Sequence, residues 1–335
     1  MNATLPIPEA RALAMAAMAA HGFAADSAEA TVEALILADR DGIPSHGLAR
    51  LPFYLRQAAS GKVLAKAAPG VEVKGAVVRV DAGHGLAFPA VLAGMQAARP
   101  VAAALGLAAV GITRSHHFGV AGHPVERAAR DGLVALAFSN TPAALPPWGG
   151  SRALMGTNPI AFACPVSGAD PLVIDLSLSK VARGKVMLAA KEGRAIPEGW
   201  ALDMDGQPTT DAQAALRGAM LPMGDAKGAA LAQMVELLAA GLTGAAFGQT
   251  ASSFFEDEGP PPGIGHLILL IDPEAFAPGF ADRAADLARA VLAQPGTRLP
   301  GAVRMAARLG NSDTIPLAPA VLAELRALAN DHTPP

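Results

Sequence analysis

The amino-acid sequence predicts an α/β protein that begins with a helical segment. Its 335 residues are 52% hydrophobic and 16% charged, a composition that can bury a sizeable core. The pattern is helical up to about residue 65, and short apolar runs between turn residues begin at about residue 71. Several of these runs are apolar on both faces, as is typical of strands that helices cover on each side. Strands alternating with helical patterns in this way indicate an α/β or α+β fold.

The first two helices are expected at residues 9–20 and 26–37. Gly22 suits the C-terminus of the first helix, which is rich in alanine. Asp26 is the expected N-cap of the second helix, and Glu29 follows it three residues later.

The rest of the chain is expected to alternate between strands and helices. The strands are expected at residues 76–80, 107–112, 133–138, 160–164, 172–176 and 266–271. The helices are expected at residues 88–103, 120–130, 226–242 and 280–293. Residues 257–263, which include consecutive prolines, are expected to form a loop, and about the last dozen residues a loose tail.

The composition excludes several classes of partner. The formal net charge is −3 and there is no basic run, so we expect no binding to nucleic acid. No apolar stretch reaches the ~20 residues of a membrane span, so we expect no membrane association. The one cysteine, Cys164, cannot form an internal disulfide, which fits a reducing cytoplasm.

A common dinucleotide-binding motif is absent. That motif is Gly-x-Gly-x-x-Gly between a strand and a helix. Residues 83–88, Gly-His-Gly-Leu-Ala-Phe, lack the third glycine. A dinucleotide would therefore have to bind on a fold other than the Rossmann fold.

The strongest candidate for catalysis is the segment that begins at Ser45. If the chain is helical there, His46, Arg50 and Tyr54 lie on one face, although a proline seven residues into that helix would kink it. An imidazole beside a hydroxyl group can donate a proton near neutral pH, and a guanidinium group suits a carboxylate. The alternative is that Ser45 only caps the helix while His46 and Arg50 face the solvent.

A second candidate segment, residues 115–123, follows a predicted strand. Backbone N–H groups are free where a strand leads into a helix, and they favour an anion. His116, His117 and His123 raise the question of a metal ion. Adjacent histidines point apart, however, and no carboxylate or cysteine lies at ligand spacing, so no metal site is expected.

Three further segments can line a ligand. Residues 146–159 combine glycine and proline, which fix loop shapes near a ligand or form a simple pair of tight turns. Asp175, at a strand end, can orient a histidine, bind a ribose or cap the next helix. Lys227, at a helix start, can meet a phosphate, or it can be an exposed lysine with Asp225 as the N-cap.

Taken together and in order, these segments resemble a known family. The matching residues are 41–42, 45–47, 50, 117–119, 148–150, 156–162, 182–185, 199–203, 208–211, 227–228 and 298–301. They resemble the malate/L-lactate dehydrogenase family that lacks a Rossmann fold. This family includes sulfolactate dehydrogenase, ureidoglycolate dehydrogenase and the reductases of Δ1-piperideine-2-carboxylate and Δ1-pyrroline-2-carboxylate. The resemblance runs from about residue 10 to residue 325.

The resemblance implies roles for individual residues. Ser45 and His46 would form the proton-donating pair, and Arg50 would grip the substrate carboxylate. His117 is the proton acceptor assigned in ureidoglycolate-type members, so either histidine can handle the proton, and Asp175 is expected to assist as an orienting residue. Further substrate contacts are expected from Tyr54, Thr157, Arg183 and Gly184. Cofactor contacts are expected from His117, Phe118, Gly119, Val120, Ala121, Asp175, Leu176, Ser177, Lys227, Leu299, Pro300, Gly301 and Arg304.

The resemblance also implies the architecture. It predicts a non-Rossmann malate/L-lactate dehydrogenase-like α/β fold with a mixed sheet, and a homodimer whose active site is either complete in one subunit or shared. Residues 1–70 are expected to form a helical segment that carries the catalytic serine, histidine and arginine. Residues 71–115 with 285–330 would form a substrate and dimerisation region, and residues 116–284 an NAD(P)-binding domain.

The predicted function is an NAD(P)H-dependent reductase or dehydrogenase of small 2-oxo or 2-hydroxy acids such as malate, lactate or sulfolactate. One alternative is a cyclic imino acid reductase, a subgroup that residues 235–244 resemble closely. Another is a nucleotide-binding regulator without catalysis, against which the intact Ser45, His46 and Arg50 argue.

Two departures from the family pattern bear on specificity. Arg183-Gly184-Lys185 stands where the piperideine-carboxylate reductases often have His-Gly-Asp, and an arginine there suits a second anionic group such as a sulfonate. Asp225 replaces a usual glycine, and its carboxylate near Lys227 can weaken a contact to a 2′-phosphate. NADPH and NADH therefore both remain candidates, with NADPH favoured.

Overall fold

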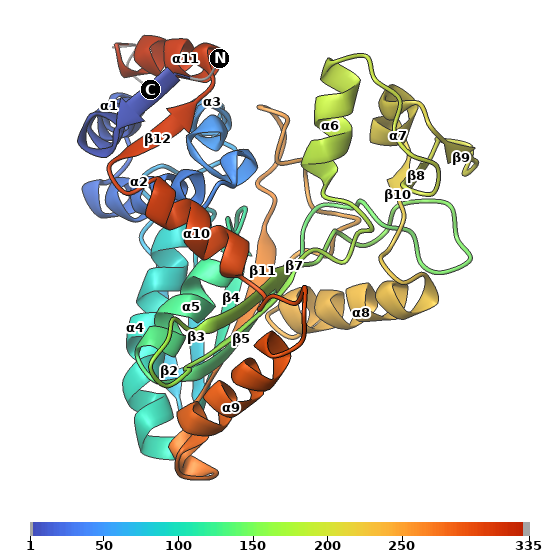
Figure 1. The fold of residues 1–335 in the computed structure, drawn as a ribbon. Coiled ribbons are helices and arrows are strands. Elements are labelled where there is room, and N and C mark those ends of the chain that lie inside the picture. Colours follow the sequence, from blue (N-terminus) through green and yellow to red (C-terminus); the bar gives the residue numbers. More distant parts are fainter. Residues whose placement is uncertain (1–2, 331–335) are drawn as a thin grey trace.

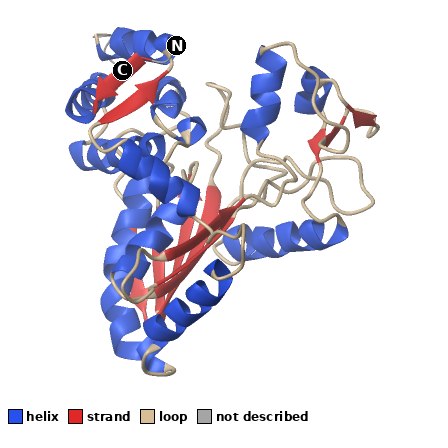
Figure 2. Ribbon diagram, viewed as in Figure 1, coloured by secondary structure: helices blue, strands red, loops and turns tan. Residues whose placement is uncertain are grey.

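A seven-stranded mixed sheet lies at the centre of the molecule, with helices around it (Figures 1 and 2). The computed structural model describes residues 3–330. The strand order is β2-β3-β4-β11-β5-β6-β7. The strands are β2 (Gly70–Lys74), β3 (Val77–Asp81), β4 (Leu107–Ser115), β5 (Val134–Ser139), β6 (Ile160–Cys164), β7 (Leu172–Leu176) and β11 (Ile264–Ile271). Every predicted strand is confirmed within a few residues, whereas β2 was not predicted.

Most of the sheet is antiparallel. Only β3 and β4 pair in parallel, and the helix α4 (Ala87–Leu105) forms the crossover that a parallel pair requires. The late strand β11 lies between β4 and β5, so that Ile268 pairs with Val110 on one side and with Ala137 on the other.

Helices cover both faces of the sheet, which confirms the apolar pattern of its strands. One face packs against α4 and α5 (Gly122–Arg130). The other packs against α8 (Ala226–Glu236) and the π-helical turn η3 (Leu237–Gly241). By length and composition α4 could cross a membrane, but it packs on the sheet, where Gly94 lies so close that a Cβ would approach Val110 Cγ1 to 2.6 Å. We therefore assign α4 as a core helix.

The two ends of the described chain build one lobe (Figure 1). Its elements are β1 (Ala3–Pro6), α1 (Ile7–Ala20), α2 (Ala25–Arg40), α3 (Leu51–Ala59), β12 (Thr314–Leu317) and α11 (Pro319–Ala329). The prediction of a loose tail is wrong up to residue 329, because α11 extends to Ala329 and Leu325 is buried in this lobe; residues 331–335 lie outside the described chain. The predicted N-cap is also wrong, since Ala24 is the N-cap of α2 and Asp26 lies in its first turn.

A second, smaller lobe lies at the upper right of Figure 1, opposite the lobe that holds the two ends of the described chain. It consists of α6 (Arg183–Lys191), β8 (Ala201–Leu202), β9 (Pro208–Thr209), α7 (Ala212–Arg217) and β10 (Ala219–Met220). The remaining elements are η1 (Pro44–His46), η2 (Leu48–Arg50), η4 (Pro273–Ala275), α9 (Phe280–Leu292) and α10 (Ala302–Gly310). The central sheet takes strands from both sides of residue 115, and the three predicted domain boundaries stay predictions.

Candidate active site

The segment that carries Ser45 and His46 forms two 3₁₀ turns, η1 and η2, joined at Gly47. The segment is therefore not one continuous helix, and the physical reason lies in the residue beneath it. Gly47 is packed on the carboxylate of Asp39, which a Cβ at this position would overlap. The chain becomes α-helical only at Leu51, so Pro52 falls in the first turn of α3, where a missing N–H costs no helical hydrogen bond.

Asp39 holds this turn from within the lobe. Its Oδ2 accepts the backbone N–H of Leu48 at 2.8 Å, and the residue is only 2% exposed. Burial raises the pKa of Asp39 to about 7, although the Leu48 hydrogen bond works in the opposite direction. Sequence reasoning missed Asp39, because an aspartate on an amphipathic helix usually faces the solvent.

His46 and His117 meet at the surface of this turn. Their ring centroids are 5.2 Å apart, although 71 residues separate them in the chain. Ser45 Oγ lies 3.0 Å from Nδ1 of His46, and Tyr54 Oη lies 2.7 Å from Nδ1 of His117. The structure thus assembles two histidines, each with a hydroxyl partner. Tyr54 is 1% exposed and its hydroxyl group faces His117, and its contact to substrate stays a prediction.

Burial and nearby positive charge favour the neutral form of both imidazoles, because they lower the pKa of each. Burial lowers the pKa of His46, and the positive charge of Arg50 lowers it further. Burial lowers the pKa of His117 well below its ordinary value, and Arg50 again adds to the effect. His46 is only half-buried, whereas His117 is 7% exposed. A neutral, accessible imidazole is suited to accept a proton, which favours His46 for that task.

Two arginines, Arg50 and Arg183, lie beside the same aromatic ring. Arg50 Nε donates to the carbonyl of Ser45 at 2.9 Å, and its Nη1 is buried without a hydrogen-bond partner among residues 3–330. The guanidinium carbon of Arg50 lies 4.6 Å from the ring centroid of Phe255, and that of Arg183 lies 5.9 Å from it. Within the described chain neither arginine forms an ion pair with a carboxylate.

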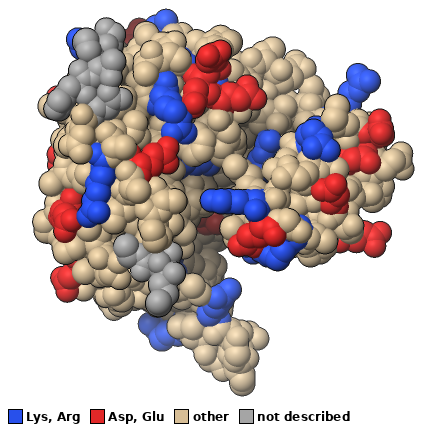
Figure 3. All heavy atoms as spheres, turned by 90° about the horizontal axis from the view of Figure 1, so that it is seen from above, with Lys and Arg blue, Asp and Glu red and all other residues tan. Residues whose placement is uncertain are grey.

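The start of α6 closes one side of the site. Residues 44–50 form the turn that is predicted to be catalytic, called the catalytic turn below. A Cβ on Gly184 would lie 3.6 Å from the Cβ of Ser45, so the predicted substrate residues Arg183 and Gly184 adjoin this turn. Between the two lobes the surface is hollowed, with basic atoms along its edge (Figure 3). Sequence reasoning missed Phe255, which lies in a loop with no pattern that would mark a ligand site.

Thr157 is held in a rigid loop. Its backbone N–H donates to Thr141 Oγ1 at 3.0 Å. The next residue, Asn158, has a φ of 42° and is fully buried, and its amide donates to Glu236 Oε2 at 2.8 Å and to the carbonyl of Ala232. These bonds fix the loop to α8, so that Thr157 keeps one position. Its contact to substrate stays a prediction.

A groove of about 610 Å³ runs beside the catalytic turn. Its lining includes residues predicted to bind a cofactor, which are Asp175, Leu299, Pro300, Gly301 and Arg304, together with residues 41–43 just before the turn. The wall also carries the exposed guanidinium group of Arg298, which suits a phosphate. Size and donor groups therefore fit a dinucleotide.

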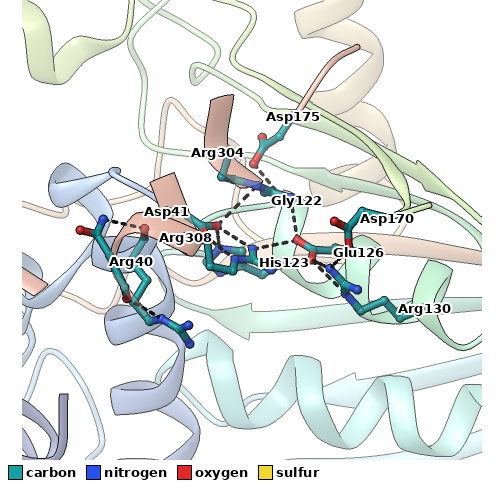
Figure 4. Close-up of polar contacts among 11 residues, drawn as sticks. Arg40, Asp41, Gly122, His123, Glu126, Arg130, Asp170, Asp175, Arg304 and Arg308 are labelled. Atoms are coloured by element: carbon teal, nitrogen blue, oxygen red, sulfur yellow. Dashed lines mark hydrogen bonds and ion pairs between the residues drawn. The ribbon is translucent and has the colours of Figure 1, made fainter. Parts of the chain in front are cut away.

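Among residues 3–330, Asp175 forms no hydrogen bond to either candidate catalytic histidine, His46 or His117. Its Oδ2 accepts the backbone N–H of Gly122 at 2.7 Å, at the start of α5 (Figure 4). The expectation of a free helix N-terminus after residue 115 is therefore wrong at Gly122, because Asp175 occupies that donor. The other face of the Asp175 carboxylate remains accessible in the groove, where binding to a cofactor stays a prediction.

A buried ion-pair network lies behind the groove (Figure 4). Arg308 contacts both carboxylates of Asp41 and Glu126, at 2.6 to 2.9 Å. Arg304 is 9% exposed and donates to Glu126 Oε2 at 2.7 Å, and His123 Nε2 lies 2.9 Å from Asp41 Oδ2. The network ties α10 to the end of α2 and to the middle of α5. Arg304, which is predicted to contact the cofactor, thus also belongs to this ion-pair network.

The other predicted cofactor residues are spread over neighbouring loops. The ring of Phe118 stacks on that of His266 with a centroid distance of 4.5 Å, and Val120 and Ala121 are buried within the loop that leads to α5. Ser177 Oγ lies 2.7 Å from Ser179 Oγ at the end of β7. Lys227 is exposed at the start of α8, and Asp225 takes the N-cap position there without a side-chain hydrogen bond. Their cofactor contacts stay predictions, as do those of Gly119 and Leu176.

Comparison with known proteins decides the family. The model of the family described as malate/L-lactate dehydrogenase matches residues 5–326. The chain belongs to the malate/L-lactate dehydrogenase family. This dehydrogenase is 61% identical over 329 residues to (2R)-3-sulfolactate dehydrogenase (NADP(+)) of Chromohalobacter salexigens, covering 98% of this chain and 99% of that protein. It is therefore an oxidoreductase, as predicted.

Reductases of cyclic imino acids are also relatives of this chain. It is 43% identical over 318 residues to the Δ1-pyrroline-2-carboxylate/Δ1-piperideine-2-carboxylate reductase of Pseudomonas syringae pv. tomato, covering 92% of this chain and 91% of that protein. The crystal structure of the Δ1-piperideine-2-carboxylate reductase from the same organism superimposes with a TM-score of 0.92 at 41% identity, covering 97% of this chain and 99% of that one. The predicted fold is confirmed.

Proposed function

We propose that the enzyme is an NADP-dependent dehydrogenase of a short 2-hydroxy acid with a second anionic group, and that (2R)-3-sulfolactate is its substrate. The observation that carries the proposal is the pair of guanidinium groups of Arg50 and Arg183, which meet at one aromatic ring without a carboxylate partner among residues 3–330. Partly buried cations are costly unless an anion joins them. A carboxylate and a sulfonate on one small molecule supply two such anions.

The two arginines would divide the substrate between them. Arg50, next to the catalytic turn, would hold the carboxylate and so present C2 to the cofactor, because a guanidinium group can bind a carboxylate through two hydrogen bonds. Arg183 would hold the sulfonate at the far end. The 61% identical relative, whose name states sulfolactate and NADP(+), supports this assignment.

His46 would take the proton of the 2-hydroxyl group. With its proton on Nδ1, the ring donates to Ser45 Oγ and leaves Nε2 as an acceptor. In the reverse direction, an anion bound at Arg50 offsets the positive charge that lowers the pKa of His46, so that the ring can carry the proton to be donated. His117, which Tyr54 holds, is the alternative proton acceptor.

The residues around the groove would hold the cofactor. NADP, when bound, supplies the hydride acceptor. Asp175 would accept a ribose hydroxyl group, Leu299 to Gly301 would cover the dinucleotide, and Arg298 would meet a phosphate. We also infer that the enzyme works in the cytoplasm as a homodimer, an inference that its single unpaired cysteine and its family support.

A substrate panel tests the proposal. NADPH and NADH absorbance would be followed with sulfopyruvate, pyruvate, oxaloacetate, Δ1-piperideine-2-carboxylate and Δ1-pyrroline-2-carboxylate. We expect the highest kcat/KM for sulfopyruvate with NADPH, and a loss of ~10²- to 10⁴-fold in kcat for His46→Asn. The second candidate, a cyclic imino acid reductase, is favoured by the 43% identical relative. High activity on the cyclic imines with none on sulfopyruvate would establish that candidate instead.

A further inference from the structure

The loop that carries Phe255 passes between α3 and α6 (Figure 1). It belongs to residues 249–263, which contain neither helix nor strand. A loop of this length with proline and glycine would be expected to move unless other groups hold its backbone. Here the backbone carbonyls of the loop are held from one side by the end of α3 and the turn that follows.

Lys62 is the central residue of this set of contacts, which we call the loop anchor. It is 0% exposed, and its Nζ donates to the carbonyls of Ser253, Glu256 and Glu258 at 2.7, 2.9 and 3.1 Å. An ammonium group has three protons to donate, so all of them are used. The three carbonyls come from one short segment, and a single buried cation therefore sets its curvature.

Neighbouring residues add to the anchor. The amide of Gln57, also 0% exposed, donates to the carbonyls of Phe254 and Glu256 at 3.1 and 2.9 Å. Ser60 Oγ donates to the carbonyl of Asp257. The backbone on both sides of Phe255 is thus fixed, and its ring can keep one position in the site.

The ring of Phe255 is where the two proposed anion-binding residues meet. It lies 4.6 Å from the guanidinium carbon of Arg50 and 5.9 Å from that of Arg183, and its edge packs against Phe53 at 6.0 Å and 90°. The two cations repel each other. Burial lowers the pKa of Arg50, and the positive charge of Arg183 also lowers it. An aromatic face attracts both guanidinium groups and keeps them near a common surface.

We propose that Phe255 determines specificity by holding Arg50 and Arg183 at the separation of two anionic groups on one substrate, and that Lys62 and Gln57 are positioning residues for Phe255. This proposal rests on the proposed function, since it assigns the two arginines to one dianionic molecule. It predicts that loss of the ring harms dianionic substrates selectively.

The main test compares two substrates in variants at one position. Phe255→Leu removes the aromatic face and keeps an apolar side chain, whereas Phe255→Trp keeps a face. We expect Phe255→Leu to lower kcat/KM at least tenfold for sulfopyruvate and less than threefold for pyruvate, mostly through KM. Phe255→Trp should restore most of the ratio between the two substrates.

The chain offers a matched control in the same loop. Phe254 is buried against the rings of His116 and His117, and among residues 3–330 it forms no cation–π contact with Arg50 or Arg183. Phe254→Leu should therefore lower activity on both substrates alike and leave their ratio unchanged. Lys62→Met and Gln57→Leu should shift the ratio in the same direction as Phe255→Leu, by about three- to tenfold. If one of these two fails to fold, the other tests the anchor, and circular dichroism reports folding for each.

A binding measurement separates this proposal from the proposed function. Calorimetry would compare the dianion 3-sulfopropanoate with the monoanion butyrate, with no turnover required. We expect Phe255→Leu to raise the Kd of the dianion at least fivefold and that of the monoanion less than twofold. Equal changes for both ligands, or none, would overturn the role of Phe255. A native enzyme that binds the dianion selectively but does not reduce sulfopyruvate would overturn only the proposed function.

Discussion

Asp39 lies directly beneath the catalytic turn, and its burial has a consequence for the protein's stability. The carboxyl group contacts Gly47 and accepts the N–H of Leu48, and it holds His46 in place through these two residues. Burial raises its pKa from 3.8 to about 7. The folded protein therefore binds a proton at Asp39 that the unfolded chain releases between these two pH values.

Asp39→Asn should change how stability depends on pH. A raised pKa stabilises the fold below the unfolded value, and this stabilisation is lost as pH rises to about 7. Asparagine keeps an acceptor for Leu48 and has no proton to release. The variant should therefore gain on the order of 4 kcal/mol relative to the native protein between pH 4 and pH 8, at about 1.4 kcal/mol for each pKa unit. Urea unfolding at several pH values measures the difference, and parallel pH dependences of the two proteins would contradict it.

Single site residues could be predicted only where the residues that contact one another are close together in the sequence. Ser45, His46 and Arg50 follow one another in a short segment, and the structure does bring them together. The partner of Tyr54 is His117, 63 residues away, and nothing local reveals such a pairing. The same holds for Lys62, whose bonds reach residues more than 190 positions later in the chain.

At the scale of elements, the short helix α10 depends on ion pairs with two other helices. Its Arg308 contacts Asp41 at the end of α2 and Glu126 within α5. Burial alone would raise the pKa values of both carboxyl groups, but the hydrogen bonds from Arg308 hold both below their usual range. Sequence analysis did not predict α10, although its nine residues form an amphipathic helix with Arg304 and Arg308 on one face.

Arg308→Met should destabilise the protein by about 3–5 kcal/mol, because it removes the four hydrogen bonds that one guanidinium group donates to two buried carboxylates. Arg130→Met is the matched control. Arg130 also contacts Glu126, but its side chain is 45% exposed, and its loss should cost under about 1 kcal/mol. Chemical denaturation at pH 7 measures both. Equal losses for the two variants would show that burial of the network does not decide its energy.

Elements with strong apolar patterns were predicted well, and those that depend on distant partners were not. β5, β6 and β7 are runs of apolar residues, and they were found within one residue of their observed bounds. β1 and β12 have four residues each and exist because they pair with each other across the whole chain. A strand of that length carries no period that could reveal it.

At the scale of the whole molecule, the first and last elements complete the lobe that carries the catalytic turn. β1 pairs with β12, and α1 packs against α11. Leu48 within the turn and Leu51 directly after it belong to the same buried cluster as Leu325 of α11. This arrangement could not be predicted from local patterns, because the contacts join residues some 300 positions apart. The stability of the active site therefore depends on the C-terminal helix.

Leu325→Ala tests this dependence. Leu325 is 1% exposed, and its truncation leaves a cavity in the lobe, which should cost about 2–5 kcal/mol. Leu309→Ala is the control, because Leu309 is 79% exposed and its loss should stay within about 0.5 kcal/mol. Unfolding by denaturant gives both values, and residual activity after heating shows whether the site fails with the lobe. If Leu325→Ala lost stability while its activity survived heating as in the native protein, the catalytic turn would be independent of α11. We expect instead that activity and the far-UV signal are lost together, at a lower temperature than in the native protein.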